Sequence, residues 1–144
     1  MAELLLIVTL GGRRIAIDAA EVESVVEMEG LVPIPRGAPH IAGLTALRSR
    51  VLTVIDCHKS LGIAPPETEC RDAIVVVRDG HPYALRVEAV EDVVEASADP
   101  APLPARLAGG WRRAGRSMVE AEGRLLLLLD TASLIAGPDL AEAA

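Results

Sequence analysis

Residues 12–27, GRRIAIDAAEVESVVE, and residues 80–95, GHPYALRVEAVEDVVE, decide the fold, because the second stretch repeats the first. A shift of 68 positions aligns them without a gap. Chance would give about one or two identities. The alignment gives seven in sixteen positions, at Gly12, Ala16, Val22, Glu23, Val25, Val26 and Glu27. Two similar halves predict two similar structural units, and the seam between them is where such a protein would bind a partner.

Short apolar runs separated by Gly and Pro predict strands in both halves. Asp18 is expected to cap a single helical turn, with Glu21 as its capping-box partner. Asp56 is expected to end a strand and to precede a short helix that Gly62 stops. The predicted strands cover residues 4–10, 15–17, about 22–28, 51–55, 73–77, 83–87, 90–95, 118–120 and 123–129.

Two segments give mixed signals. Residues 40–47 carry apolar side chains at helical spacing, but Gly43 weakens a helix there. Pro33 and Pro35 place residues 31–35 at a sheet edge or in a loop. Three prolines echo this pattern in the second half, at Pro100, Pro102 and Pro104.

Many short, evenly spaced strands predict an all-β barrel architecture, and the repeat predicts two small barrels related by a pseudo-two-fold axis. Each half alone would bury only about 60% of its surface, so the halves should share a core. The first repeat covers about residues 4–62 and the second about 73–136, with strand exchange between them left open. Residues 63–72 read as a linker, and residues 137–144 as a tail that frays from Pro138.

The composition excludes several classes of partner. The net charge is −7 with no run of Lys or Arg, so nucleic acid and anionic membrane surfaces are poor partners. Trp111 and Tyr83 are too few aromatic residues for a nucleic-acid stacking surface. No apolar run approaches the ~20 residues that span a bilayer, so no direct membrane insertion is expected. Cys57 and Cys70 are too few for a disulfide framework, which indicates a cytoplasmic protein.

No residue pattern points to catalysis, to a metal or to a cofactor. The chain has no P-loop, no GxGxxG and no His or Cys pair at metal-ligand spacing. Cys57 and His58 resemble a nucleophile beside its base, but neighbours along a strand point in different directions. We therefore expect a buried Cys57, a surface His58 and no enzymatic activity.

Spacing alone leaves two charged features open. Arg48, which lies between Leu47 and the strand at 51–55, is either an ordinary loop arginine or an interface anchor, since Arg is enriched at hot spots. The acidic residues of the repeat form either a solvated face, which we favour, or a patch that attracts a basic partner. They are Glu21, Glu23 and Glu27 in the first half, and Glu88, Glu91, Asp92 and Glu95 in the second.

The central stretch carries a more specific signal. Residues 39–49, PHIAGLTALRS, followed by 51–56, VLTVID, resemble the signature of CheW-like domains. That signature runs P-x-x-I-x-G-x-x-N-L-R-G, then an apolar strand with an inner proline, then an aspartate. ID at 17–18 and VESVV at 22–26 resemble further segments of the family, and the likeness covers about residues 3–136.

The resemblance implies a single CheW-like domain over residues 1–136, built as two intertwined five-stranded SH3-like barrels with short helical turns. It also implies a non-catalytic chemotaxis adaptor that couples the cytoplasmic helical tip of a transmembrane chemoreceptor to the regulatory domain of a CheA-type histidine kinase. Such proteins are cytoplasmic and are recruited to membrane receptor arrays. They use the groove between the barrels for the receptor and a barrel end for the kinase.

The resemblance also selects the residues expected to bind partners. We expect Val26 and Met28 to line the groove between the barrels and to accept an amphipathic receptor helix. Arg48 is expected to fix the register through a charge-assisted hydrogen bond. The full predicted set is Val25, Val26, Met28, Ile41, Gly43, Leu47 and Arg48.

Four positions depart from the family signature. Ala46 replaces its asparagine, Ser49 its final glycine and Thr53 its inner proline, while Cys57 follows Asp56. These departures motivate an alternative, a divergent CheW-like scaffold for a kinase pathway other than chemotaxis, such as pilus motility or development.

Overall fold

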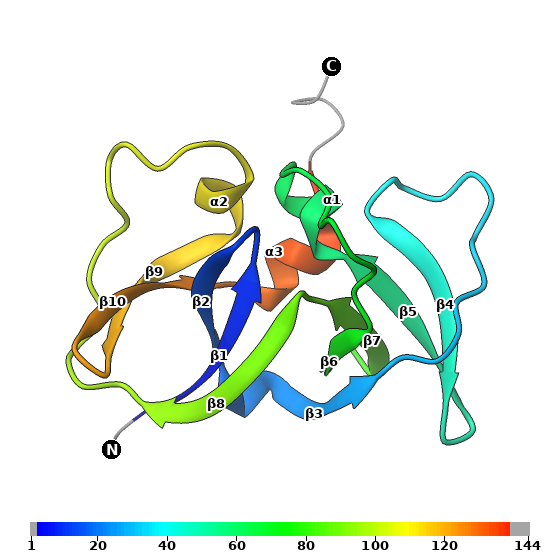
Figure 1. Cartoon of the computed structure of the whole chain (residues 1–144), viewed down its shortest axis with the longest axis horizontal. Helices are drawn as coiled ribbons and strands as arrows, with labels where there is room; N and C mark the ends of the chain where they lie inside the picture. Colours follow the sequence, from blue (N-terminus) through cyan, green and yellow to red (C-terminus); the bar gives the residue numbers. More distant parts are fainter. Residues whose placement is uncertain (1–2, 139–144) are drawn as a thin grey trace.

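The strands of the molecule pair into two five-stranded sheets (Figure 1). The structure is a computed structural model that describes residues 3–138. In chain order the strands are β1 (Leu4–Leu10), β2 (Arg13–Asp18), β3 (Val22–Glu27), β4 (Ile41–Leu47), β5 (Arg50–Asp56), β6 (Asp72–Arg78), β7 (His81–Arg86), β8 (Ala89–Glu95), β9 (Gly115–Ala121) and β10 (Arg124–Leu129). The helical elements are the 3-10 turn η1 (Ala19–Glu21), and α1 (Cys57–Leu61), α2 (Gly109–Ala114) and α3 (Thr131–Ala136).

The repeated stretch is the point at which the chain crosses from one sheet to the other. Barrel A has the order β8-β1-β2-β10-β9, and barrel B has the order β3-β6-β7-β5-β4. Replacing each strand by its counterpart in the other half converts one order into the other. β2 lies in barrel A and β3 in barrel B, whereas β7 lies in barrel B and β8 in barrel A. Each barrel therefore contains strands from both halves, which resolves the strand exchange that the sequence left open.

Proline-bearing segments complete each barrel at its edge strand. Val32 forms an antiparallel bridge with Leu44 of β4, and Ala101 forms one with Met118 of β9. Pro33 and Pro102 follow the two bridge residues. Proline cannot donate to a sheet ladder, so it suits a short pairing at an edge. The echo between the two sets of prolines thus reflects equivalent positions in the two barrels.

An aliphatic core joins the barrels, as predicted. Successive residues of a strand face opposite sides of its sheet. Leu5 and Ile7 of β1 accordingly pack inside barrel A, while Leu6, Val8 and Leu10 pack in the cluster between the barrels. That central cluster also takes buried residues from β6 and β7 of barrel B, so it belongs to neither barrel alone.

Three short helices pack together and lie near one another between the two barrels (Figure 1). α1 begins after Asp56, whose side chain accepts from the Lys59 N–H, and ends at Gly62 with φ of 68°, as predicted. Arg113 of α2 donates to the carbonyl oxygens of Ser60 in α1 and Ser133 in α3, at 2.7 Å each. Arg113 therefore links the three helices through hydrogen bonds.

The structure settles one segment that the sequence left open and corrects one local prediction. Residues 41–47 form a strand rather than a helix, because pairing with β5 overrides the helical spacing. Asp18 caps η1 as expected, but Glu21 binds other side chains instead of completing a capping box. α2 had no predicted counterpart. Most of the predicted frayed tail, residues 139–144, lies outside the described residues.

None of the helices in residues 3–138 is long and apolar enough to cross a membrane.

Candidate functional site

A small hollow opens at one end of barrel B, lined by apolar side chains and by the polar residues Glu27, Glu29 and Thr45. Its volume is about 220 Å³. Val26 and Met28 line it from β3 and the residue just after, and Leu47 lines it from the end of β4. Leu52 and Ala84, both fully buried, also line it. The structure therefore brings three of the predicted partner-binding residues, Val26, Met28 and Leu47, into one site.

Arg48 lies at the tip of the hairpin beside this hollow. Arg48 and Ser49 join β4 to β5 with φ of 48° and 68°, the left-handed pair typical of a type I′ turn. The Arg48 side chain is exposed. Within residues 3–138 it makes no hydrogen bond or ion pair, so its guanidinium is available to a partner.

The other predicted residues lie elsewhere on barrel B. Val25 points to the opposite side of β3 from Val26 and is 46% exposed. Ile41 is half-buried against the core between the barrels. Gly43 is buried with φ of 151°, and a Cβ there would overlap the carbonyl oxygen of Val32. Gly43 therefore lets residues 31–33 run close alongside β4, which is a structural role.

The predicted location of Val26 and Met28 was wrong. Both pack against the internal cluster of barrel B, together with Leu47, and neither belongs to the cluster between the barrels. The crossover explains the difference. The chain leaves barrel A after η1, and β3 becomes the edge strand of barrel B. Alternate side chains of β3 therefore fill barrel B instead of the seam.

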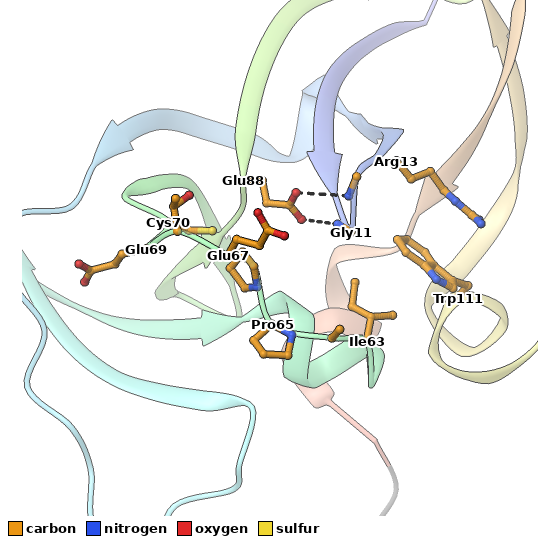
Figure 2. A pocket seen from close by; sticks show the side chains of 13 residues that line it. Gly11, Arg13, Ile63, Pro65, Glu67, Glu69, Cys70, Glu88 and Trp111 are labelled. Carbon is orange, nitrogen blue, oxygen red and sulfur yellow. Dashed lines mark hydrogen bonds between the residues drawn. The ribbon is translucent and has the colours of Figure 1, made fainter.

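A larger hollow of about 590 Å³ lies between the β1–β2 turn, the segment after α1 and the helix α2 (Figure 2). Figure 2 shows the carboxylate of Glu88 directed at Gly11 and the ring of Trp111 beside Arg13. Glu88 accepts from the backbone N–H of Gly11 and, at 3.3 Å, from that of Gly12. Its Oε2 lies 2.6 Å from Nε2 of His58. Glu88 thus connects the hairpin of barrel A to α1.

The environment of Glu88 favours its charged form. Burial disfavours the carboxylate, but hydrogen bonds from His58 and from the two glycine N–H groups outweigh burial and hold the pKa of Glu88 below its ordinary value. His58 is 3% exposed, so the prediction of a surface histidine was wrong. No motif in the sequence links positions 58 and 88, and only the fold brings these residues together.

Cys57 and His58 do not form a reactive pair. Cys57 is fully buried, and burial strongly raises the pKa of its thiol. A nucleophilic cysteine needs a lowered thiol pKa and some exposure. The imidazole of His58 interacts with Glu88. Within residues 3–138, no group of three or more His, Cys, Asp or Glu side chains is arranged to hold a metal ion.

Glu21 makes the corresponding connection at the other crossover. Its carboxylate accepts from Thr131 of α3 at 2.9 Å, from Arg116 of β9 at 3.1 Å and from Arg78 of β6 at 3.4 Å. Arg116 also donates to Asp130 at 2.8 Å. The acidic side chains of the repeat are therefore not all solvated, because Glu21 and Glu88 hold the two barrels together.

Comparisons with known proteins agree with this geometry. A model of the CheW-like domain family matches residues 4–138. Chemotaxis protein CheW of Thermotoga maritima is 25% identical over 121 residues, which cover 84% of this chain and 80% of that protein. Chemotaxis protein CheW of Rhizobium meliloti is 25% identical over 127 residues, which cover 87% of this chain and 82% of that protein.

The same fold occurs in a solved structure. The crystal structure of the scaffolding protein TtCheW from Thermoanaerobacter tengcongensis matches with a TM-score of 0.80 at 21% identity, over 90% of each chain. The predicted architecture of two five-stranded SH3-like barrels is thus confirmed. The family model covers almost every described residue. The chain therefore belongs to the CheW-like domain family.

Proposed function

We propose that the protein is a signalling adaptor that links the cytoplasmic helical tip of a transmembrane chemoreceptor to the regulatory domain of a CheA-type histidine kinase. The observation that carries the proposal is the CheW-like domain match over residues 4–138. Two relatives bear the name Chemotaxis protein CheW, and the structural neighbour is described as a scaffolding protein. These names support an adaptor role in chemotaxis. We propose that this role is carried out at membrane receptor arrays.

The hollow at the end of barrel B is the proposed contact with the kinase. At about 220 Å³ it is smaller than the roughly 300–1,000 Å³ of typical small-molecule sites, so it suits a single side chain of a protein partner. Met28 and Leu47 would contact that side chain. Arg48 would form a charge-assisted hydrogen bond beside it and fix the register. Ile41 and Gly43 would act by shaping β4.

The receptor tip is proposed to lie along the seam between the barrels. Val25 and its repeat counterpart Val93 are 46% and 54% exposed. On the neighbouring strand of its own sheet, Val25 is paired with Ile74 and Val93 with Leu6. Both partners belong to the core between the barrels. Val25 and Val93 are thus exposed at the margins of that core. An amphipathic receptor helix would bury both.

The hairpin at Arg48 has an internal control for a binding experiment. Glu122 and Gly123 form the equivalent turn of barrel A, with φ of 52° and 75°. We expect Arg48→Ala to weaken binding of the kinase regulatory domain at least tenfold by calorimetry, and Glu122→Ala to leave it unchanged. Val25→Asp should weaken capture by a receptor-tip fragment without changing kinase affinity. An Arg48→Ala protein that binds kinase and receptor as well as the wild type contradicts the assigned role.

Affinity capture from native cells separates the chemotaxis assignment from the alternative pathway. The proposal predicts that a CheA-type kinase and a chemoreceptor are recovered together. Recovery of a kinase of pilus motility or development, with no chemoreceptor, contradicts it.

A further inference from the structure

A second large groove lies on barrel A, the barrel opposite the proposed kinase site. Its volume is about 590 Å³. One wall is the loop before α2, and the floor comes from β2, β9 and β10. The lining residues are Arg13, Arg14, Pro104, Arg106, Leu107, Ala108, Trp111, Met118, Leu125, Leu126 and Leu127.

The floor of the groove leaves a large apolar side chain in water. Leu125 is 64% exposed. The side chains of Leu107, Trp111 and Met118 are half-buried around the same groove. Removing a leucine side chain from water is favourable, because it buries apolar surface. Covering Leu125 with an apolar group of a partner would therefore favour binding.

The charge at the groove is opposite to that of the whole chain. Its charged lining residues are three arginines, with no acidic side chain among them, on a protein whose net charge is −7. Arg14 is neutralised by Glu91 at 2.8 Å. Arg13 stacks over Trp111, with its guanidinium carbon 4.8 Å from the ring centre, and keeps its charge. Arg106 makes no ion pair with any residue of 3–138. Two cations thus remain to attract carboxylates.

The loop wall of the groove is held in place before any ligand binds. The guanidinium of Arg112 in α2 donates to the carbonyl oxygens of Leu107 at 2.6 Å, Pro104 at 3.0 Å and Ala105 at 3.4 Å. The Leu107 N–H also donates to Pro104 O at 3.1 Å. A pre-formed wall lowers the entropic cost of binding, because the loop need not be ordered by the ligand. Arg112 is therefore a positioning residue.

We propose that this groove binds an acidic peptide segment of a partner protein that also carries apolar side chains. An apolar side chain packs on Leu125, Met118 and Trp111, while carboxylates pair with Arg13 and Arg106. Arginine binds carboxylates in a bidentate geometry that suits such recognition. This contact goes beyond the proposed function and is independent of it, because no lining residue is shared with the barrel B hollow.

A peptide fits the groove better than an anionic membrane surface does. The apolar side chains of Leu107, Trp111 and Met118 are half-buried in the groove, whereas residues that insert into a membrane must protrude from the surface. Glu91 neutralises part of the basic lining. These features favour a narrow ligand over an extended charged surface.

Trp111 makes the proposal testable, because it is the sole tryptophan of the chain and it lines the groove. Its fluorescence would be titrated with a 16-residue amphipathic peptide of Glu, Leu and Ala. Two further peptides carry Gln for Glu, or Ser for Leu. The proposal predicts a saturable emission change with the first peptide and at least tenfold weaker binding of the other two. The absence of a saturable change with the first peptide overturns it.

Single substitutions locate the binding. Arg106→Glu and Leu125→Ser change exposed residues, so both proteins should keep the wild-type circular dichroism spectrum and bind at least tenfold more weakly. Arg112→Lys should weaken binding, because lysine cannot hold the same three carbonyls. Arg124→Glu alters a neighbouring exposed arginine outside the groove and should bind normally.

Trp111 also lines the hollow of Figure 2, so one control addresses that site. Glu67→Gln changes the lining of that hollow and should leave peptide affinity unchanged. Two further results overturn the proposal. One is an equal loss of peptide affinity in the Glu67→Gln and Arg106→Glu proteins. The other is an Arg106-dependent emission change with phosphatidylglycerol vesicles but not with peptide, which would assign the groove to membranes.

Discussion

Left-handed turn residues show how single positions shape this molecule. Four two-residue hairpin turns of the described chain have positive φ at both positions. Gly12, Gly80 and Gly123 occupy the second position in three of them, with φ of 72°, 78° and 75°. Ser49 occupies it in the fourth, with φ of 68°. The departure from the family signature at Ser49 therefore falls where a side chain is least favourable.

Replacing Ser49 by glycine should stabilise the protein. A left-handed residue with a Cβ costs roughly 1–2 kcal/mol, and the greater freedom of glycine in the unfolded chain offsets part of the gain. We expect Ser49→Gly to raise the free energy of unfolding by about 0.5–1 kcal/mol in urea titrations. Gly123→Ser in the equivalent turn should lower it by a similar amount. A less stable Ser49→Gly protein would show that the serine side chain contributes something the turn geometry does not explain.

Gly43 should tolerate no side chain. A Cβ at this position would overlap the Val32 carbonyl oxygen, and φ of 151° is itself unfavourable for other residues. Gly43→Ala is expected to lower the free energy of unfolding by at least about 2 kcal/mol. Gly30→Ala is the comparison, because a Cβ at Gly30 meets no atom within 4 Å. Equal, small effects of the two substitutions in urea titrations would contradict the assigned role of Gly43.

At the scale of elements, each crossover carries a carboxylate that binds the start of a helix. Glu21 accepts from Thr131, the first residue of α3, and Glu88 pairs with His58, the second residue of α1. α3 follows β10, which runs parallel to β2. In the same way α1 follows β5, which runs parallel to β7. The two carboxylates therefore connect the segments where the chain passes between the barrels to the helices α3 and α1. We call the Glu88 contact with His58 the Glu88 clamp.

The Glu88 clamp should make stability depend on pH. Because the folded protein holds the pKa of Glu88 below its ordinary value of about 4.3, the clamp contributes fully above that value. Its contribution is lost as pH falls through the folded pKa. We expect Glu88→Gln to cost about 1–2 kcal/mol at pH 7, with a difference from wild type that narrows below about pH 4.

The matching control is the exposed ion pair of Arg14 with Glu91, at 2.8 Å. Glu91→Gln should lower stability much less than Glu88→Gln does, since exposed ion pairs contribute little. Urea unfolding of both variants between pH 3 and pH 7 checks the prediction. A difference between wild type and Glu88→Gln that widens as pH falls would contradict it.

At the scale of the whole molecule, the repeat predicts duplication but not which barrel each strand joins. The alternation of side chains between the two faces of the strand at residues 22–27 is a local feature, which can be read from the sequence. The pairing of β3 with β6, and of β8 with β1, is long-range and depends on the total packing. For that reason the sequence does not reveal that Val26 and Met28 pack inside barrel B and not in the core between the barrels.

The candidate site was partly predictable for similar reasons. Leu47 and Arg48 stand in a recognisable signature, and the fold brings Leu47 together with Val26 and Met28. The groove on barrel A was not predicted, because α2 begins with two glycines and lacks a side-chain cap. Its helix is held by tertiary hydrogen bonds from Arg113, which no local pattern reveals.

Strand exchange predicts that neither half folds alone. A fragment ending in the linker at 63–72 keeps β1 and β2 but loses β8, β9 and β10, their partners in barrel A. We expect fragments 1–66 and 67–144 to be unfolded separately and to regain the native circular dichroism spectrum when mixed. An independently folded half would show that the barrels are not mutually dependent.

The most direct test of the adaptor account maps the kinase contact on this chain by methyl NMR. The Val, Leu, Ile and Met methyl groups would be followed during titration with the regulatory domain of a CheA-type kinase. The account predicts the largest shifts at Val26, Met28 and Leu47, and their loss at the same concentrations in the Arg48→Ala protein. Shifts confined to barrel A, or no shifts at saturating kinase domain, would contradict it.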